Sequence, residues 1–215
     1  MNKQFFGIII VVVLALVGVF ALTSKDVGQQ AGGGGDKAAT TSNHIAGKAD
    51  SKVTLIEYGD FQCPACKSYF PLVTELKNTY GDRVAFQFRH YPLVQIHPNA
   101  FISSRAAEAA GKQDKFFEMH DLLYENQDNW ANLTVANANT LFESYAQELQ
   151  LDVEKFKTDM NSAAVADTIN ADARAAQAAG GNSTPTFVLN GSKIDKNPQS
   201  LDEFKKLLDD ELAKN

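Results

Sequence analysis

The sequence predicts an α/β fold in which a block of helices interrupts a small sheet. Three observations support this prediction. A strand pattern, a helix pattern and a second strand pattern follow one another between residues 53 and 90. Residues 98–180 then show helical periodicity, and the chain returns to strand patterns and a last helix after residue 186. Because a strand–helix–strand unit forms a parallel pair with a crossover, the helical stretch is interpreted as an inserted subdomain.

The N-terminal segment is expected to lie outside the fold. Residues 5–22 form an uninterrupted apolar run behind Lys3. This length is at the lower edge of what spans a bilayer and exceeds an ordinary signal-peptide core. Two interpretations stay open. Residues 1–23 are retained as a cell-membrane anchor with the remaining chain on the extracytoplasmic side, or they are cleaved as a signal and the protein is secreted.

A flexible tether and one folded domain are predicted after this run. Residues 24–43 contain four consecutive glycines and have no apolar periodicity, so they are expected to form the tether. The folded domain is then residues 44–215, with the helical insertion at about 98–180. The formal net charge of −6 and the lack of a basic cluster argue against nucleic acid as a partner.

The first strand–helix–strand unit follows from local patterns. Val53–Tyr58 is mostly apolar and β-branched, as a central strand should be. Residues 63–80 have apolar side chains at helical spacing, and Gly81 ends that pattern. Val84–His90 alternates apolar and polar residues and is the second predicted strand.

The helical block and the C-terminal unit have their own signals. The helix that includes Phe116 and His120 is expected to begin behind an Asp114 cap, and an alanine-rich helix is expected to stop at Gly180. Thr186–Leu189 and Ser192–Ile194 are predicted strands joined by Asn190-Gly191, a strong hairpin signal. Ser200-Leu-Asp-Glu203 is a capping box that opens the last helix.

Both cysteines of the chain, Cys63 and Cys66, lie within one helical turn. A disulfide between them closes almost no loop, so it contributes little stability, and reactivity is the better reason for the pair. Pro64 fits the first position of a helix, which makes Cys63 the N-cap residue. The unpaired N–H groups and the helix dipole lower the pKa of a thiol there. Cys63 is therefore predicted to be the exposed nucleophile, and Cys66 the resolving thiol.

A zinc site and an inert structural disulfide are the alternatives to redox chemistry at this cysteine pair. The pair could supply half of a zinc site, but the remaining ligands are missing, because the four histidines form no close pair along the sequence. We therefore expect thiol–disulfide exchange, no bound metal, and no cofactor besides the redox-active cysteines. His90, His97 and His120 are expected to be packing or hydrogen-bonding residues.

The sequence resembles the DsbA-like branch of the thioredoxin superfamily from about His44 to the C-terminus. The resemblance rests on the segment that ends in Cys63-Pro-Ala-Cys66, on Arg89-His-Tyr-Pro-Leu93, on His97-Pro-Asn-Ala100, on the helical insertion and on Ser183-Thr-Pro-Thr-Phe187. It implies a thioredoxin-like fold interrupted by a helical domain, and oxidation of cysteines in exported polypeptides.

The resemblance also implies roles for residues outside the cysteine motif. Thr184 and Pro185 match the cis-proline loop, which lies against the cysteines and helps to bind the substrate backbone. The alternative is an ordinary trans proline at a sheet edge. Glu57 matches a buried acid that assists proton transfer to and from the inner cysteine, and the alternative is a half-exposed glutamate at a strand end. The dipeptide Pro64-Ala65 departs from the strongly oxidising members, which have histidine in the second place, so the direction of electron flow stays open.

The function expected from the sequence is that of an extracytoplasmic dithiol oxidase. Its substrates would be unfolded exported polypeptides with free cysteines, and a membrane oxidase of the DsbB or VKOR type would recycle it. The chain would act as a monomer and contact the membrane through residues 5–22. A reductase or isomerase on the same scaffold is the first alternative, and a thioredoxin-fold binding module without catalysis is the second.

Overall fold

The computed structural model describes residues 39–214, which form one compact unit. The predicted anchor and residues 24–38 of the predicted tether lie outside the described residues. Within residues 39–214, no helix combines the length and the apolar character needed to cross a bilayer.

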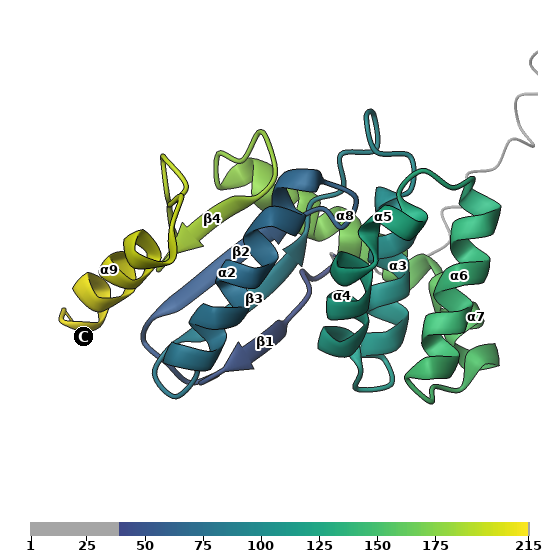
Figure 1. Ribbon diagram of the computed structural model, residues 1–215, viewed down its shortest axis with the longest axis horizontal. Coiled ribbons are helices and arrows are strands. Elements are labelled where there is room, and N and C mark those ends of the chain that lie inside the picture. Colours follow the sequence, from purple (N-terminus) through teal and green to yellow (C-terminus); the bar gives the residue numbers. More distant parts are fainter. Residues whose placement is uncertain (1–38, 215) are drawn as a thin grey trace, which may run out of the picture. The chain divides into compact units, whose positions relative to one another are not determined.

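A five-stranded mixed sheet lies at the centre of the fold, in the order β1-β3-β2-β4-β5 (Figure 1). The strands are β1 (His44–Gly47), β2 (Thr54–Gly59), β3 (Ala85–His90), β4 (Thr186–Leu189) and β5 (Ser192–Lys193). β2 and β3 are parallel, and every other neighbouring pair is antiparallel. The parallel pair and its crossover helix confirm the strand–helix–strand prediction.

The four predicted strands are confirmed to within one residue at their ends, but β1 was not predicted as a strand. Its sequence, His-Ile-Ala-Gly, is only four residues long and has no run of β-branched side chains. It becomes a strand because it pairs with β3, with His44 opposite Phe88 and Gly47 opposite Ala85. Such a long-range pairing leaves little trace in the local sequence.

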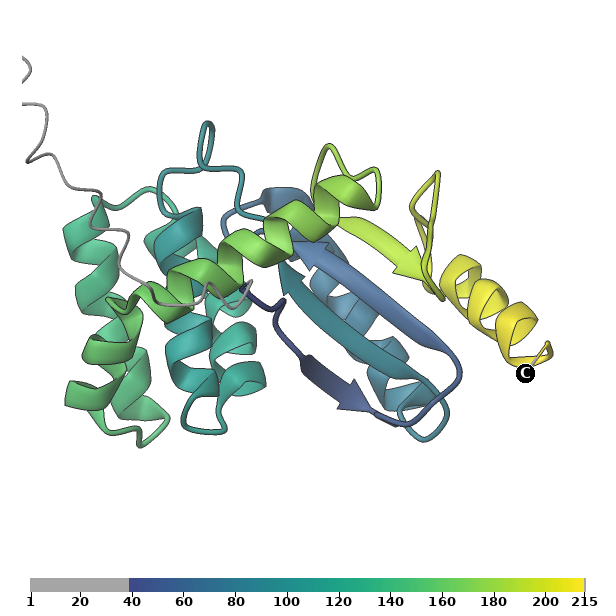
Figure 2. The same cartoon turned by 180° about the vertical axis from the view of Figure 1, so that it is seen from behind.

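Eight helices surround the sheet in the described residues. They are α2 (Pro64–Tyr80), α3 (Ala100–Gly111), α4 (Phe116–Glu125), α5 (Gln127–Trp130), α6 (Val135–Glu148), α7 (Val153–Met160), α8 (Ala163–Ala178) and α9 (Leu201–Leu212). The crossover helix α2 packs with α9 over a core that includes Leu76, Phe187 and Phe204. α8 lies on the opposite face of the sheet (Figure 2).

Helices α3 to α8 fill the stretch that was predicted as a helical insertion. α3 to α7 stand beside the sheet as a bundle, whereas the last turns of α8 return to it (Figures 1 and 2). There, Ala176 packs with Tyr58 of β2 and Val188 of β4. The bundle core includes Trp130 and Phe142 and is continuous with Phe61 and Cys66 at the start of α2. The cysteine motif is therefore held between the sheet and the bundle.

The turns and caps confirm most of the local predictions. Asn190 and Gly191 both have positive φ, 46° and 81°, as a two-residue hairpin turn requires. The Ser200 hydroxyl accepts a hydrogen bond from the N–H of Glu203, which confirms the cap of α9. The Asp114 cap is wrong, because Lys115 is the N-cap of α4 and Asp114 has φ of 60°. The chain reverses sharply between α3 and α4, and Asp tolerates this left-handed turn better than most residues.

A buried carboxylate on α8 joins the N-terminal edge of the domain to β3. Asp172 has no exposed surface, and its oxygens accept hydrogen bonds from Ser42 N at 2.9 Å, Ser42 Oγ at 2.6 Å and His90 N at 3.0 Å. Two of these donors are backbone groups, which have no replacement partner if the carboxylate is removed. Asp172 therefore fixes the chain just ahead of β1.

We predict that Asp172→Ala lowers the free energy of unfolding by roughly 2–4 kcal/mol, because buried donors lose their acceptor. The exposed Asp167 on the same helix provides the control, and Asp167→Ala should change stability by no more than about 0.5 kcal/mol. Urea unfolding measures both. Equal effects of the two substitutions would contradict the role given to Asp172.

Candidate active site

The cysteine motif opens α2 as the sequence predicted. Cys63 is the N-cap residue, with extended backbone angles (φ −71°, ψ 122°), and Pro64 follows in the first helical turn. The N–H of Cys63 donates to the carbonyl oxygen of Asp60 at 3.0 Å. Neither cysteine forms a disulfide in this structure.

The pKa of the Cys63 thiol is lowered from 9.0 to about 5. The largest cause is a hydrogen bond from the Cys66 thiol, and burial opposes it. The Thr184 side chain and the backbone N–H groups of Cys66 and Ala65 favour the thiolate further. Cys63 keeps 7% of its surface exposed, against 0% for Cys66. The prediction that Cys63 is exposed is therefore wrong, although Cys63 is the more accessible of the two cysteines.

The pKa of the Cys66 thiol is raised well above 9.0. Burial is the largest cause, followed by the hydrogen bond that Cys66 donates to Cys63 and by the negative charges of Glu57 and Cys63. The N–H of Asp60 opposes this shift. The two thiols therefore differ strongly, with a thiolate favoured at Cys63 and a thiol at Cys66.

Glu57 is buried on β2, with 6% of its surface exposed, so the alternative of a half-exposed glutamate is wrong. Burial raises the pKa of this carboxyl from 4.5 to about 8, the positive charge of Lys77 opposes the shift, and Cys63 adds to it. The Oε1 atom of Glu57 has no hydrogen-bond partner among the described residues. A carboxyl in this setting stays protonated near neutral pH.

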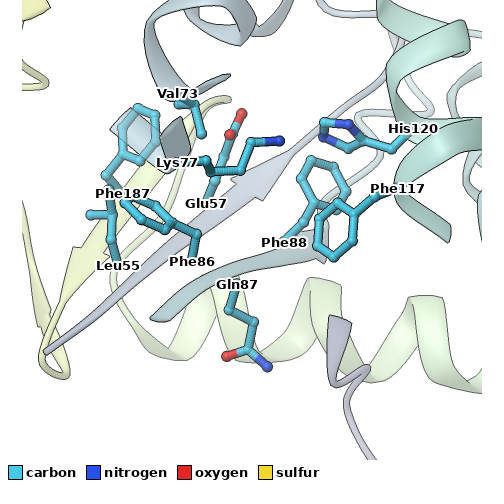
Figure 3. A pocket seen from close by; sticks show the side chains of 10 residues that line it. All are labelled: Leu55, Glu57, Val73, Lys77, Phe86, Gln87, Phe88, Phe117, His120 and Phe187. Atoms are coloured by element: carbon cyan, nitrogen blue, oxygen red, sulfur yellow. The ribbon is translucent and has the colours of Figure 1, made fainter. Parts of the chain in front are cut away.

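Glu57 lines a small, mostly apolar pocket between the sheet and α2 (Figure 3). The Lys77 ammonium group points into the space between the Glu57 carboxyl and the His120 ring. His120 is also buried, and burial is the main reason that its pKa is lowered to about 4. Because His120 is neutral at ordinary pH, Lys77 is the cation nearest to Glu57 in this pocket.

The Thr184–Pro185 peptide bond is cis, so the alternative of a trans edge proline is wrong. The loop lies against the first cysteine, with the carbonyl oxygen of Thr184 3.5 Å from Cys63 Sγ. Pro185 is followed directly by β4, which pairs with β2 and places Phe187 opposite Glu57. Sheet pairing therefore brings together Cys63, Glu57 and the Thr184–Pro185 loop from three separate segments.

The helical bundle contributes a side chain that the sequence did not predict. Gln127 of α5 is buried, and its amide Nε2 donates to the carbonyl oxygens of Phe61 at 2.7 Å and Cys63 at 3.0 Å. These two bonds fasten the segment that leads into α2 to the bundle. No local signal distinguishes Gln127 from an ordinary surface glutamine, because its partners are more than 60 residues away.

Asp60 also organises the approach to the cysteines. Its buried carboxylate accepts hydrogen bonds from Gln62 N at 2.8 Å and Leu93 N at 2.9 Å, and contacts His97 Nδ1 at 2.7 Å. His97 is therefore a hydrogen-bonding residue, as predicted. Lys67, the residue after Cys66, forms an ion pair with Asp128 at 2.7 Å.

Hollows lie on both sides of the cysteine motif. A groove of about 840 Å³ runs between the start of α2 and the bundle, lined by Pro64, Gln127, Leu133 and others. Ile96, on its rim, has 67% of its surface exposed. A second hollow of about 320 Å³ adjoins Pro185 and Tyr69. Cys63 itself lines neither hollow, but its chain neighbour Pro64 lines the first, and Pro185 of the cis-proline loop lines the second.

The pH dependence of stability tests the burial of Glu57. In the unfolded chain this carboxyl ionises near its ordinary pKa of 4.5, whereas in the folded protein it keeps its proton up to about pH 8. The folded state binds more protons between these values, so stability falls as pH rises. We predict that oxidised wild-type protein loses on the order of 3 kcal/mol more than oxidised Glu57→Gln between pH 5 and pH 8.

Urea unfolding at both pH values measures this difference, and the oxidised form keeps the cysteines from titrating. Contributions from His120 are common to both proteins and cancel. The exposed Glu75 on α2 provides a control, since Glu75→Gln should keep the wild-type pH dependence. The same slope for wild type and Glu57→Gln would contradict a raised pKa at Glu57.

Comparison with known proteins agrees with this geometry. A protein family described as Thioredoxin matches residues 39–210. BdbD from Bacillus subtilis is 27% identical, with a TM-score of 0.66 over 82% of this chain and 98% of that chain. Alpha-DsbA1 from Wolbachia pipientis shares the fold, with a TM-score of 0.68 at 21% identity over 79% of this chain and 90% of that chain.

Curated relatives match over part of their length. A protein named Na(+)/H(+) antiporter NhaA 1 from Mycobacterium sp. (strain KMS) is 36% identical over 155 residues, which is 70% of this chain and 24% of the relative. The chain thus spans about a quarter of the length of these relatives. The family match over residues 39–210 shows that the chain belongs to the thioredoxin family, and its fold is similar to that of the DsbA-like protein alpha-DsbA1.

Proposed function

We propose that this protein is a dithiol oxidase that forms disulfides in exported proteins. The observation that supports this direction is the asymmetry of the two thiols. A thiolate that is stable at Cys63 favours the reduced form of the pair, so the disulfide form accepts electrons readily. The pKa of Cys66 is raised, so this inner sulfur is favoured as a protonated thiol, whereas Cys63 is favoured as a thiolate.

The reaction proceeds as two exchanges. A substrate thiolate attacks Cys63 Sγ of the Cys63–Cys66 disulfide, forms a mixed disulfide and releases the Cys66 sulfur as a thiolate, which takes up a proton. A second substrate thiolate then attacks the substrate sulfur of the mixed disulfide and expels Cys63 as a thiolate. The substrate loses two electrons and gains a disulfide, and the protein gains two electrons. Cys63 is a good leaving group because its pKa is low.

Glu57 is the proposed proton donor to Cys66. Its carboxyl is protonated near neutral pH, and the group lies close enough that its ionised form raises the pKa of Cys66 and that the Cys63 thiolate raises the pKa of Glu57. When Cys66 is released as a thiolate, its high pKa favours taking this proton, directly or through a water molecule. Lys77 would stabilise the carboxylate that Glu57 then becomes.

The substrate is proposed to be an extended, unfolded polypeptide. Thr184 and Pro185 border the exposed edge of Cys63, where they can align a substrate backbone, and the grooves on either side have room for neighbouring side chains. The apolar rim at Ile96 and Leu133 favours substrates that have not yet buried their own apolar residues.

The location and the recycling partner are proposals of the same kind. Residues 5–22 would anchor the chain and place the domain on the extracytoplasmic side, where thiol oxidation is useful. A relative named as a sodium–proton antiporter is 36% identical over 155 residues of this chain, which supports a site of action at a membrane. A quinone-linked membrane oxidase of the DsbB or VKOR type would reoxidise the cysteines, and the protein would work as a monomer.

A reductase or isomerase on the same scaffold is the competing function, and it requires a pair that is mostly reduced in its compartment. The direction of net electron transfer between the protein and its substrate distinguishes the two functions.

We expect one equivalent of oxidised protein to convert two thiols of a reduced, unfolded substrate into one disulfide. Cys63→Ser should abolish this activity, and so should Cys66→Ser, because neither variant can hold the oxidising disulfide. Given a disulfide-bonded substrate instead, Cys66→Ser should trap a mixed disulfide, because the Cys63 thiolate attacks one substrate sulfur and releases the other as a thiolate. Thiol counting and mass spectrometry measure both outcomes. Net reduction of substrate disulfides would favour the competing function.

The dipeptide between the cysteines should tune the oxidising power. We predict that Ala65→His lowers the Cys63 pKa below its wild-type value of about 5, because an imidazolium would face the thiolate. A shift of about one pKa unit is roughly 1.4 kcal/mol and makes the potential about 30 mV more oxidising. Ala65→Gln adds a polar side chain of similar length without charge and should have a much smaller effect. Thiolate absorbance gives the pKa of Cys63. An unchanged pKa and an unchanged reduction potential in Ala65→His would show that the dipeptide does not determine the oxidising power.

A further inference from the structure

A second cluster of reactive side chains lies outside the cysteine site. His44 Nε2 and His90 Nε2 lie 2.7 Å and 2.8 Å from the same atom, Glu108 Oε1. These three ligand-type atoms are all within 4.8 Å of one another, and within residues 39–214 this is the only such group of three. No metal was expected from the sequence, because these residues are far apart along the chain.

The fold brings the three residues together from three elements. β1 supplies His44, β3 supplies His90 at its last position, and α3 supplies Glu108. The His44 ring stacks on Phe116, with centroids 3.5 Å apart and planes within 6°. Gly111 leaves room for this ring, since a Cβ added at Gly111 would lie 3.1 Å from His44 Cε1. The orientation of His44 is therefore fixed by packing as well as by Glu108.

We propose that His44, His90 and Glu108 bind a divalent first-row transition metal ion of the zinc type. Two imidazole nitrogens and one carboxylate oxygen are a donor set that Zn²⁺ accepts, with water in the fourth position. Metal bonds of about 2.0–2.2 Å in a tetrahedral site place ligand atoms about 3.3 Å apart. The two present contacts to Oε1 would each open by about half an ångström, which side-chain rotation can supply.

The tautomer of His90 can adapt to a bound cation. His90 Nδ1 has no hydrogen-bond partner among the described residues. His90 can thus move its proton to Nδ1 and offer a lone pair at Nε2 without breaking another bond.

The site is half-enclosed and has a side open to solvent. The side chains of His90, Glu108 and His44 are 0%, 10% and 19% exposed, so an ion would enter past His44. A bound ion would join the edge strand β1 to β3 and α3, and its binding would stabilise the folded state. Ion binding can therefore be measured as an increase in the stability of the folded protein, without any assay of the cysteines.

The test uses the full chain with Cys63→Ser and Cys66→Ser, so that thiolates cannot bind the ion. Co²⁺ is the spectroscopic probe and Zn²⁺ the competitor. We expect one Co²⁺ per chain with visible bands of a four-coordinate nitrogen–oxygen site, displaced by Zn²⁺, and a higher melting temperature with Zn²⁺. His44→Gln and Glu108→Gln, each in the same cysteine-free background, should weaken binding at least tenfold and remove the thermal shift.

His97→Gln is the matched control, because His97 also contacts a buried carboxylate at 2.7 Å but has no second histidine beside it. This variant should bind Co²⁺ as the parent does. Absence of Co²⁺ and Zn²⁺ binding in the parent would overturn the proposal, as would binding that survives His44→Gln unchanged. His44 is partly exposed, so its substitution should fold even if Glu108→Gln does not.

Discussion

The N-terminus of α2 is the constraint on which the site depends. β2 is buried and ends at Gly59, and the chain then turns within a few residues so that Cys63 caps the helix. Backbone N–H groups at this end favour a thiolate at Cys63, and the Cys66 thiol, one turn inside, donates to it. The same hydrogen bond lowers the pKa of one sulfur and raises that of the other. The N-terminus of one helix therefore makes Cys63 the reactive sulfur and keeps Cys66 as a protonated resolving thiol.

The surrounding fold holds this terminus from several directions. The sheet places Glu57 beneath it, β4 brings the Thr184–Pro185 loop beside it, and Gln127 fastens its backbone to the helical bundle. The bundle and the sheet share one apolar core at Phe61 and Cys66. The helical insertion is thus part of the active-site framework as well as a wall of the groove.

The sequence predicted those structural features that depend on interactions between neighbouring residues. The β-branched run of β2, Pro64 after the N-cap, the Asn190-Gly191 turn and the Ser200 cap all depend on neighbours within a few residues. Contacts between segments that are far apart in the sequence could not be predicted from such local patterns. β1 exists because it pairs with β3, Gln127 acts on residues more than 60 positions away, and His44 meets Glu108 across 64 positions. Glu57 and Pro185 were found through the family resemblance, since an isolated acid in a strand or a proline before one does not specify its role.

The reduction potential of the Cys63–Cys66 pair, equilibrated against glutathione, is the most direct measure of whether the helix terminus makes this protein an oxidant. Stabilisation of the Cys63 thiolate predicts a potential above roughly −200 mV, on the oxidising side of thioredoxin at about −270 mV. A value at or below that of thioredoxin would contradict the account, because a stable thiolate would then not be setting the direction of electron flow.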